Sequence, residues 1–101
     1  MKRIEIDAAL FTSREETHRV LKKALDFPDY DGCNLDALHD CLTDIAEDTE
    51  IVLLDDGAFR KRLGNFADGL IRVFRESAEE NPMLSFSVKV GKKRKDRYLS
   101  E

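Results

Sequence analysis

The apolar run at residues 51–54, Ile-Val-Leu-Leu, is the feature that most constrains the fold of this chain. Its length and its β-branched residues are typical of a strand buried on both faces, as in a parallel sheet. Residues 3–7 and 83–90 alternate between polar and apolar side chains, which predicts a strand near each end of the chain. Both intervals between these strands are long enough for helical crossovers. We therefore expect three parallel strands joined by right-handed connections.

Helix-start and helix-stop signals divide those two intervals into four helices. Ser13 and Glu16 form a capping box ahead of an apolar stripe that continues to about residue 25. The other caps and breakers that we expect are, in chain order, Asn34, Asp55 with Asp56, Gly64, Asn65, and Asn81 with Pro82. The predicted order is β-α-α-β-α-α-β, and 101 residues suffice for one core. We predict an α/β fold: a single small domain at residues 1–90, with a three-stranded parallel sheet packed with about four helices, and a basic, flexible tail at 91–101.

The charge of the chain is distributed unevenly. Residues 24–59 contain 11 acidic residues and no Lys or Arg, whereas the rest of the chain has 17 basic and 10 acidic residues. Such an asymmetry is most often a solvated acidic face opposite a basic one. A surface of this sign also attracts a basic partner through long-range steering. Three of the acids are expected to share one helix face, which favours the second interpretation.

The segment at residues 28–45 combines a turn with an amphipathic helix. Pro28 and Gly32 end the preceding helix and permit a tight reversal of the chain. The apolar stripe of the helix consists of Leu35, Leu38, Leu42 and Ile45. Its acidic ridge consists of Asp36, Asp40 and Asp44, with His39 beside it. Like charges four residues apart destabilise a helix by about 0.2–0.5 kcal/mol per pair. Because no basic residue lies nearby in sequence, we expect the positive charge to come from another molecule.

Nothing in the sequence indicates export or membrane insertion. No apolar run approaches the ~18 residues that span a bilayer, and acidic residues near the start interrupt what would be the apolar core of a signal peptide. A cytoplasmic location with free thiols is therefore expected. Cys33 and Cys41 have no further soft ligand nearby and make a poor zinc site, so we expect no cofactor.

Four classes of function are compatible with parts of this pattern. Asp36, His39 and Asp40 have a spacing that would place three metal ligands on one helix face, although this spacing is common. The same convex surface would exclude no water, which argues against acid–base catalysis and against an enzyme. The basic tail lacks the interleaved aromatic residues of a nucleic-acid site. A protein interface fits best, because Tyr30 and Leu35 would supply apolar anchors inside a charged rim.

Residues 29–43 resemble the central loop and helix of the barstar family, and residues 18–25 and 73–76 resemble its first and last helices. This resemblance implies a three-stranded parallel sheet with helices packed on it. It also implies an intracellular, monomeric inhibitor that forms a one-to-one complex with a basic, secreted, guanyl-specific ribonuclease of the barnase type. By position, Asp40 would enter the phosphate-binding site of the enzyme and pair with its Arg and His groups. The same resemblance places Tyr30, Gly32, Asn34, Leu35 and Asp36 in the interface and gives Glu76 a peripheral ion pair.

This chain departs from the family's type member at four positions near the acidic ridge. His39 and Ile45 stand where the type member has aromatic residues, Asp44 where it has a glycine, and Cys33 where it has an acid. We expect His39 and Asp44 to remain on the partner-facing surface and to adapt it to a particular nuclease. Two alternatives remain: an immunity or regulatory protein for a different toxin or partner, and a protein that binds a metal through the Asp and His side chains of residues 36–40.

Overall fold

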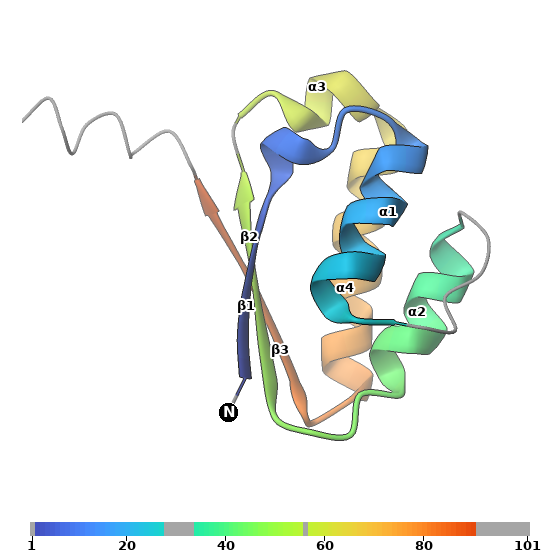
Figure 1. Cartoon of the computed structure of the whole chain (residues 1–101), viewed down its shortest axis with the longest axis vertical. Coiled ribbons are helices and arrows are strands. Elements are labelled where there is room, and N and C mark those ends of the chain that lie inside the picture. The colour runs from blue at the N-terminus through green and yellow to red at the C-terminus, as the bar shows by residue number, and fades with distance from the viewer. Residues whose placement is uncertain (1, 28–33, 56, 91–101) are drawn as a thin grey trace, which may run out of the picture.

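The chain folds into a three-stranded parallel sheet with its main helices on one side (Figure 1). The computed structural model describes residues 2–27, 34–55 and 57–90. In chain order the elements are β1 (Lys2–Asp7), the 3-10 helix η1 (Ala8–Leu10), α1 (Arg14–Leu25), α2 (Leu35–Thr43), β2 (Thr49–Asp55), α3 (Phe59–Leu63), α4 (Asn65–Glu80) and β3 (Leu84–Val90). The predicted order of strands and helices is confirmed, with η1 as an addition. Among these elements, no helix is long and apolar enough to cross a membrane.

β2 is the central strand and pairs in parallel with β1 on one side and with β3 on the other. Ile51 and Leu53 belong to the core under the helices and are fully buried. Val52 points to the opposite face, yet it is only 1% exposed. Its register neighbours are Glu5 on β1 and Ser87 on β3, and Figure 1 shows α1, α2 and α4 on the other side of the sheet. The middle of the strand is therefore buried on both faces, as predicted, whereas Glu50 and Leu54, on the face of Val52, are partly exposed.

Polar caps begin α1 and α2 where the sequence predicts them. The Ser13 hydroxyl accepts a hydrogen bond from the Glu16 N–H at 3.0 Å, and the Asn34 side chain accepts one from the Ala37 N–H at 2.7 Å. The Glu16 carboxylate accepts from Arg19 at 2.9 Å instead of completing the predicted capping box. Each cap satisfies one of the free N–H groups of the first turn, so both helices begin at a defined residue.

The predicted helix cap at Asp55 is wrong. Asp55 is the last residue of β2 and continues the ladder with β3, opposite Val90. Its carboxylate accepts from the Gly57 N–H at 2.8 Å and pairs with Arg60 at 3.3 Å, so it closes the turn between β2 and α3. Asp56 lies outside the described residues.

The predicted cap at Asn65 is also wrong, by one position. α3 ends at Gly64, as predicted, and α4 begins directly after it with Asn65 as its first residue. Gly64 has a φ of +58°, a backbone conformation that glycine adopts without strain. One glycine therefore separates the two helices, and α4 has no polar side-chain cap.

α4 packs against both the sheet and α2, and it holds α2 in place. Phe74 on α4 is fully buried and stacks on Phe86 of β3, with ring centroids 4.7 Å apart. Leu38 and Leu42 of α2 are fully buried in the same core. Burying one such leucine stabilises a protein by about 1.5–3 kcal/mol. These two leucines fix which face of α2 points inward and, consequently, which face points to solvent.

Candidate functional site

The exposed side of α2 carries the predicted acidic residues. Asp36 and Asp40 lie one turn apart on the helix and are exposed, while Leu38 and Leu42 are buried on its other side. Asp44 does not continue the ridge as a helical residue, because α2 ends at Thr43 and Asp44 is its C-cap. The sequence predicts a ridge of three helical aspartates; the structure gives two, followed by an exposed acid at the helix end.

No basic side chain neutralises this surface within the described residues. Asp36, Asp40 and Asp44 form no ion pair there, and the last turn of α2 contains no basic residue. Acids near a helix C-terminus interact unfavourably with the partial negative charge of its last carbonyls. The positions of Asp40 and Asp44 thus destabilise the free helix.

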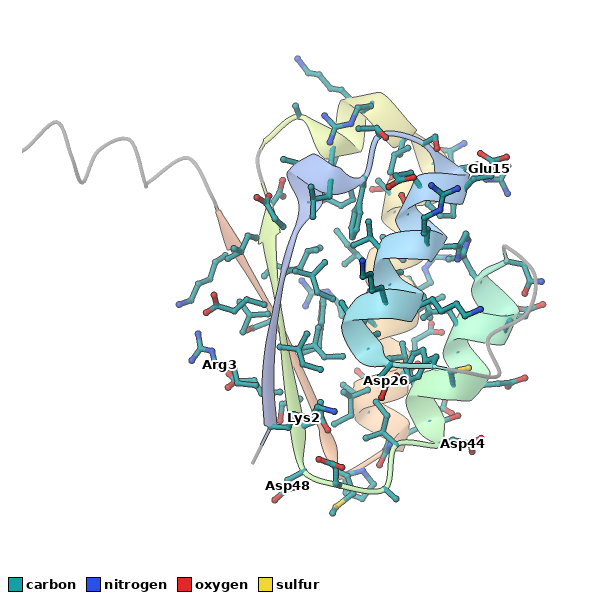
Figure 2. The ribbon with its side chains drawn as sticks, in the orientation of Figure 1. Lys2, Arg3, Glu15, Asp26, Asp44 and Asp48 are labelled. Carbon is teal, nitrogen blue, oxygen red and sulfur yellow. The ribbon has the colours of Figure 1, made fainter. Side chains whose placement is uncertain are left out.

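The acidic surface continues beyond α2. Figure 2 shows Asp44 projecting at the end of α2, Asp48 on the connection to β2, and Asp26 at the end of α1 nearby. All three side chains are exposed. Two basic residues of β1, Lys2 and Arg3, are labelled near Asp48, and the Lys2 backbone N–H donates to the Asp48 carbonyl at 2.9 Å. The exposed acids near α2 thus come from three segments of the chain.

His39 lies beside the ridge and contacts α4. Its Nε2 atom is 3.3 Å from the Glu80 carboxylate, and both side chains are partly exposed. Within the described residues, no group of three or more His, Cys, Asp or Glu side chains could hold a metal ion. The spacing at residues 36–40 thus does not produce a metal site, and the metal-binding alternative receives no support.

Leu35 and Asn34 fix the beginning of the helix. The Asn34 side chain is the N-cap, so its oxygen is already occupied by the Ala37 N–H. Leu35 is half-buried, and its Cδ1 atom would lie 3.0 Å from a Cβ atom at position 69. Gly69 on α4 therefore leaves the space that Leu35 fills. Leu35 was predicted as an interface residue, and the structure adds a packing contact beneath α2.

Asn81 is a functional candidate that sequence reasoning missed. It was predicted only as the breaker that ends α4, and this prediction is confirmed. Its buried side chain also donates to the carbonyls of Leu42, Thr43 and Ile45, at 3.0, 3.3 and 3.0 Å. Those carbonyls lie 36 to 39 residues away in sequence. No local pattern could reveal the contact.

The remaining predicted site residues lie on a helix other than α2 or outside the described part of the chain. Glu76 is exposed on α4, the helix that supports α2. Tyr30 and Gly32 lie outside the described residues, as does Cys33. The structure therefore groups Asp36, His39 and Asp40 on one helix, with Glu76 on the helix behind it.

The structure is thus a small parallel α/β domain that exposes two aspartates of α2, Asp36 and Asp40, without an ion-pair partner among the described residues. The family model for barstar, described as "Barstar (barnase inhibitor)", matches residues 1–91. The chain is also similar to a Bacillus subtilis (strain 168) protein named "Putative ribonuclease inhibitor YrdF". The two are 43% identical over 81 residues, and this aligned region covers 79% of this chain and 89% of that protein. The chain belongs to the barstar family, whose members are inhibitors and not enzymes.

Proposed function

We propose that this protein is a one-to-one inhibitor of a basic, secreted, guanyl-specific ribonuclease of the barnase type, and that it acts in the cytoplasm as a monomer. The observation that carries this proposal is the pair of exposed carboxylates on α2, Asp36 and Asp40, which have no ion-pair partner among the described residues. The family match and the name of the Bacillus subtilis relative support a ribonuclease as the target.

The mechanism rests on imitation of the substrate's charge. A ribonuclease binds RNA phosphates through Arg, Lys and His side chains, and a carboxylate offers the same groups two acceptor oxygens. Asp40 would enter the phosphate-binding site, with Asp36 beside it. The interface would be completed by Tyr30, Gly32, Asn34, Leu35, His39, Asp44 and Glu76. The surrounding acids would raise the association rate through electrostatic steering.

The test is inhibition of RNA cleavage by a purified barnase-type ribonuclease at increasing inhibitor concentration. We expect a one-to-one end point, and an association rate that falls steeply as ionic strength rises. Asp40→Ala should weaken binding by at least about 2 kcal/mol, or roughly thirtyfold in Kd, because the enzyme's buried cations lose their partner. Glu5→Ala is the matched control, since Glu5 is an exposed acid on β1, on the sheet face opposite the helices. Parent-like binding by Asp40→Ala would show that α2 is not the inhibitory helix.

A second candidate is an immunity or regulatory protein for a different nuclease toxin. It is favoured by His39, which differs from the aromatic residue of the family's type member and turns toward Glu80. If the parent chain leaves the barnase-type enzyme active but blocks another basic secreted nuclease, this candidate replaces the first.

A further inference from the structure

The C-terminal end of α2 is held weakly by its own backbone. The Asp44 N–H reaches the carbonyls of Asp40 and Cys41 at 3.2 and 3.3 Å, and the Ile45 N–H reaches that of Leu42 at 3.3 Å, all at or beyond the long end of ordinary N–H···O distances. Two acids, Asp40 and Asp44, lie at this end, and no basic residue occupies the last turn. α2 has nine residues, and a helix that short is not stable alone in water. Its end is therefore a point at which the orientation of Asp40 could be lost.

Asn81 supports this end of α2 from the framework. Its Nδ2 group directs two N–H donors at three carbonyls, those of Leu42, Thr43 and Ile45, within 3.0–3.3 Å. Its Oδ1 atom accepts from the Met83 N–H at 3.0 Å. The residue is 6% exposed, so water does not readily replace these bonds.

The backbone of Asn81 is fixed on both sides. Its N–H donates to the Ser77 carbonyl in α4 at 2.9 Å, and its carbonyl accepts from the Leu84 N–H at the start of β3 at 3.0 Å. The side chain that holds α2 is thus attached where α4 and β3 meet. The preceding residue, Glu80, contacts His39 of α2. Two successive residues of the α4–β3 junction therefore hold the same helix.

We propose that Asn81 is a positioning residue of the inhibitor: it fixes the end of α2 and thereby holds Asp40 in the geometry that the nuclease recognises. This inference rests on the proposed function, because it takes α2 as the inhibitory helix. Asn81 does not need to touch the enzyme. It acts through Asp40, and it lowers the conformational freedom that α2 would otherwise lose on binding.

The test is a double-mutant cycle on the dissociation rate of the complex, with Asn81→Ala, Asp40→Ala and the double variant. Asn81→Ala alone should speed dissociation about tenfold, since several buried hydrogen bonds are lost. In the Asp40→Ala background it should have little further effect, because its action depends on Asp40. Ser77→Ala is the matched control. Ser77 is fully buried one turn earlier on α4, and its hydroxyl has no hydrogen bond within the described part of the chain. We expect this variant to dissociate like the parent.

The outcomes separate the two proposals. If Asp40→Ala binds like the parent, the assignment of α2 fails. If Asp40→Ala is weakened but Asn81→Ala is not, or if the two effects multiply fully, the positioning role fails while the function stands. Hydrogen exchange of the free inhibitor gives a readout that needs no nuclease. Asn81→Ala should speed exchange of the α2 amides and leave those of β2 unchanged. Uniformly faster exchange would show a purely global effect. Asn81→Ser, which keeps one donor, serves the same tests if Asn81→Ala does not fold.

Discussion

Leu35 at the start of α2 packs directly against Gly69 in the second turn of α4: its Cδ1 atom would be 3.0 Å from a Cβ atom at position 69. Real Cβ atoms seldom approach another heavy atom so closely. The absence of a side chain on α4 therefore lets α2 lie close to α4 at its N-terminal end. Asn81 holds α2 at the other end. The two contacts together fix the helix that carries Asp36 and Asp40.

A larger side chain at position 69 should push α2 away. We expect Gly69→Val to destabilise the protein by about 1–3 kcal/mol, as overpacked core substitutions do. Gly69→Ala should be close to neutral, because its gain in helix propensity of about 1 kcal/mol offsets a small shift of the flexible Leu35 side chain. Denaturant unfolding measures both free energies.

Leu35→Ala identifies the cause of that destabilisation. In the Leu35→Ala background, Gly69→Val should destabilise less than it does in the parent, because the obstructing Cδ1 atom is gone. An unchanged effect would mean that the valine disturbs α4 by itself and that the contact with α2 is not responsible.

Neutralising Asp40 should stabilise the free protein while it weakens binding to the nuclease. Asp40 lies near the helix C-terminus and one turn from Asp36 and Asp44, so Asp40→Asn relieves both the dipole and the like-charge repulsion. We expect about 0.3–1 kcal/mol of added stability. The same change at Asp36, in the first turn, should add nothing, because the helix dipole favours an acid there. Thermal unfolding of the two variants checks the contrast. A loss of stability in Asp40→Asn would mean that Asp40 has a stabilising role in the free protein.

Local signals in the sequence were sufficient for the order of the elements and for the polarity of α2. Residues 51–54 indicated a buried strand of a parallel sheet, and Asn34 marked the start of α2 correctly. The errors fall where tertiary contacts decide. Asp55 stays in the sheet because β3 continues beside it, and a local cap pattern contains no information about that pairing.

The two contacts that hold α2 in place could not be predicted for a similar reason. Gly69 and Asn81 act on α2 from α4 and its end, and both are separated from their partners by more than 30 residues. A glycine within a helical pattern and an Asn before a Pro have ordinary local explanations. Their contacts with α2 appear only when α4 is placed against it.

Arg62 links α3 to the segment that follows β1, and its replacement tests how much this link stabilises the protein. Its guanidinium donates to the carbonyls of Phe11 and Ala8, at 2.9 and 3.0 Å, across more than 50 residues. Arg62→Met should destabilise the protein by about 1–3 kcal/mol, because those carbonyls lose their charged donor. Lys61→Met on the neighbouring, exposed residue is the control and should change stability little. Equal effects in urea unfolding would show that the loss of charge, not the loss of these hydrogen bonds, is responsible.

The buried His18 should make stability depend on pH. Burial lowers the pKa of His18 below its ordinary value of 6.5, and the nearby Arg14 lowers it further, while Glu15 opposes the shift. Below pH 6.5 the unfolded chain therefore binds a proton that the folded protein takes up less readily. The free energy of unfolding should be highest above pH 6.5 and should fall as the pH drops from 6.5 toward the pKa of His18 in the folded protein. Below that folded-state pKa it should become constant, because His18 is then protonated in both states.

Urea unfolding at several pH values between about 5 and 8 measures this dependence. His18→Phe should flatten the profile across that window, because the titrating group is gone and an aromatic ring can still pack on Phe66, whose ring centroid lies 5.6 Å from that of His18. Leu10→Ala, at an exposed residue that does not titrate, is the control and should keep the parent's pH profile. A profile that stays steep in His18→Phe would show that His18 is not the source of the pH dependence.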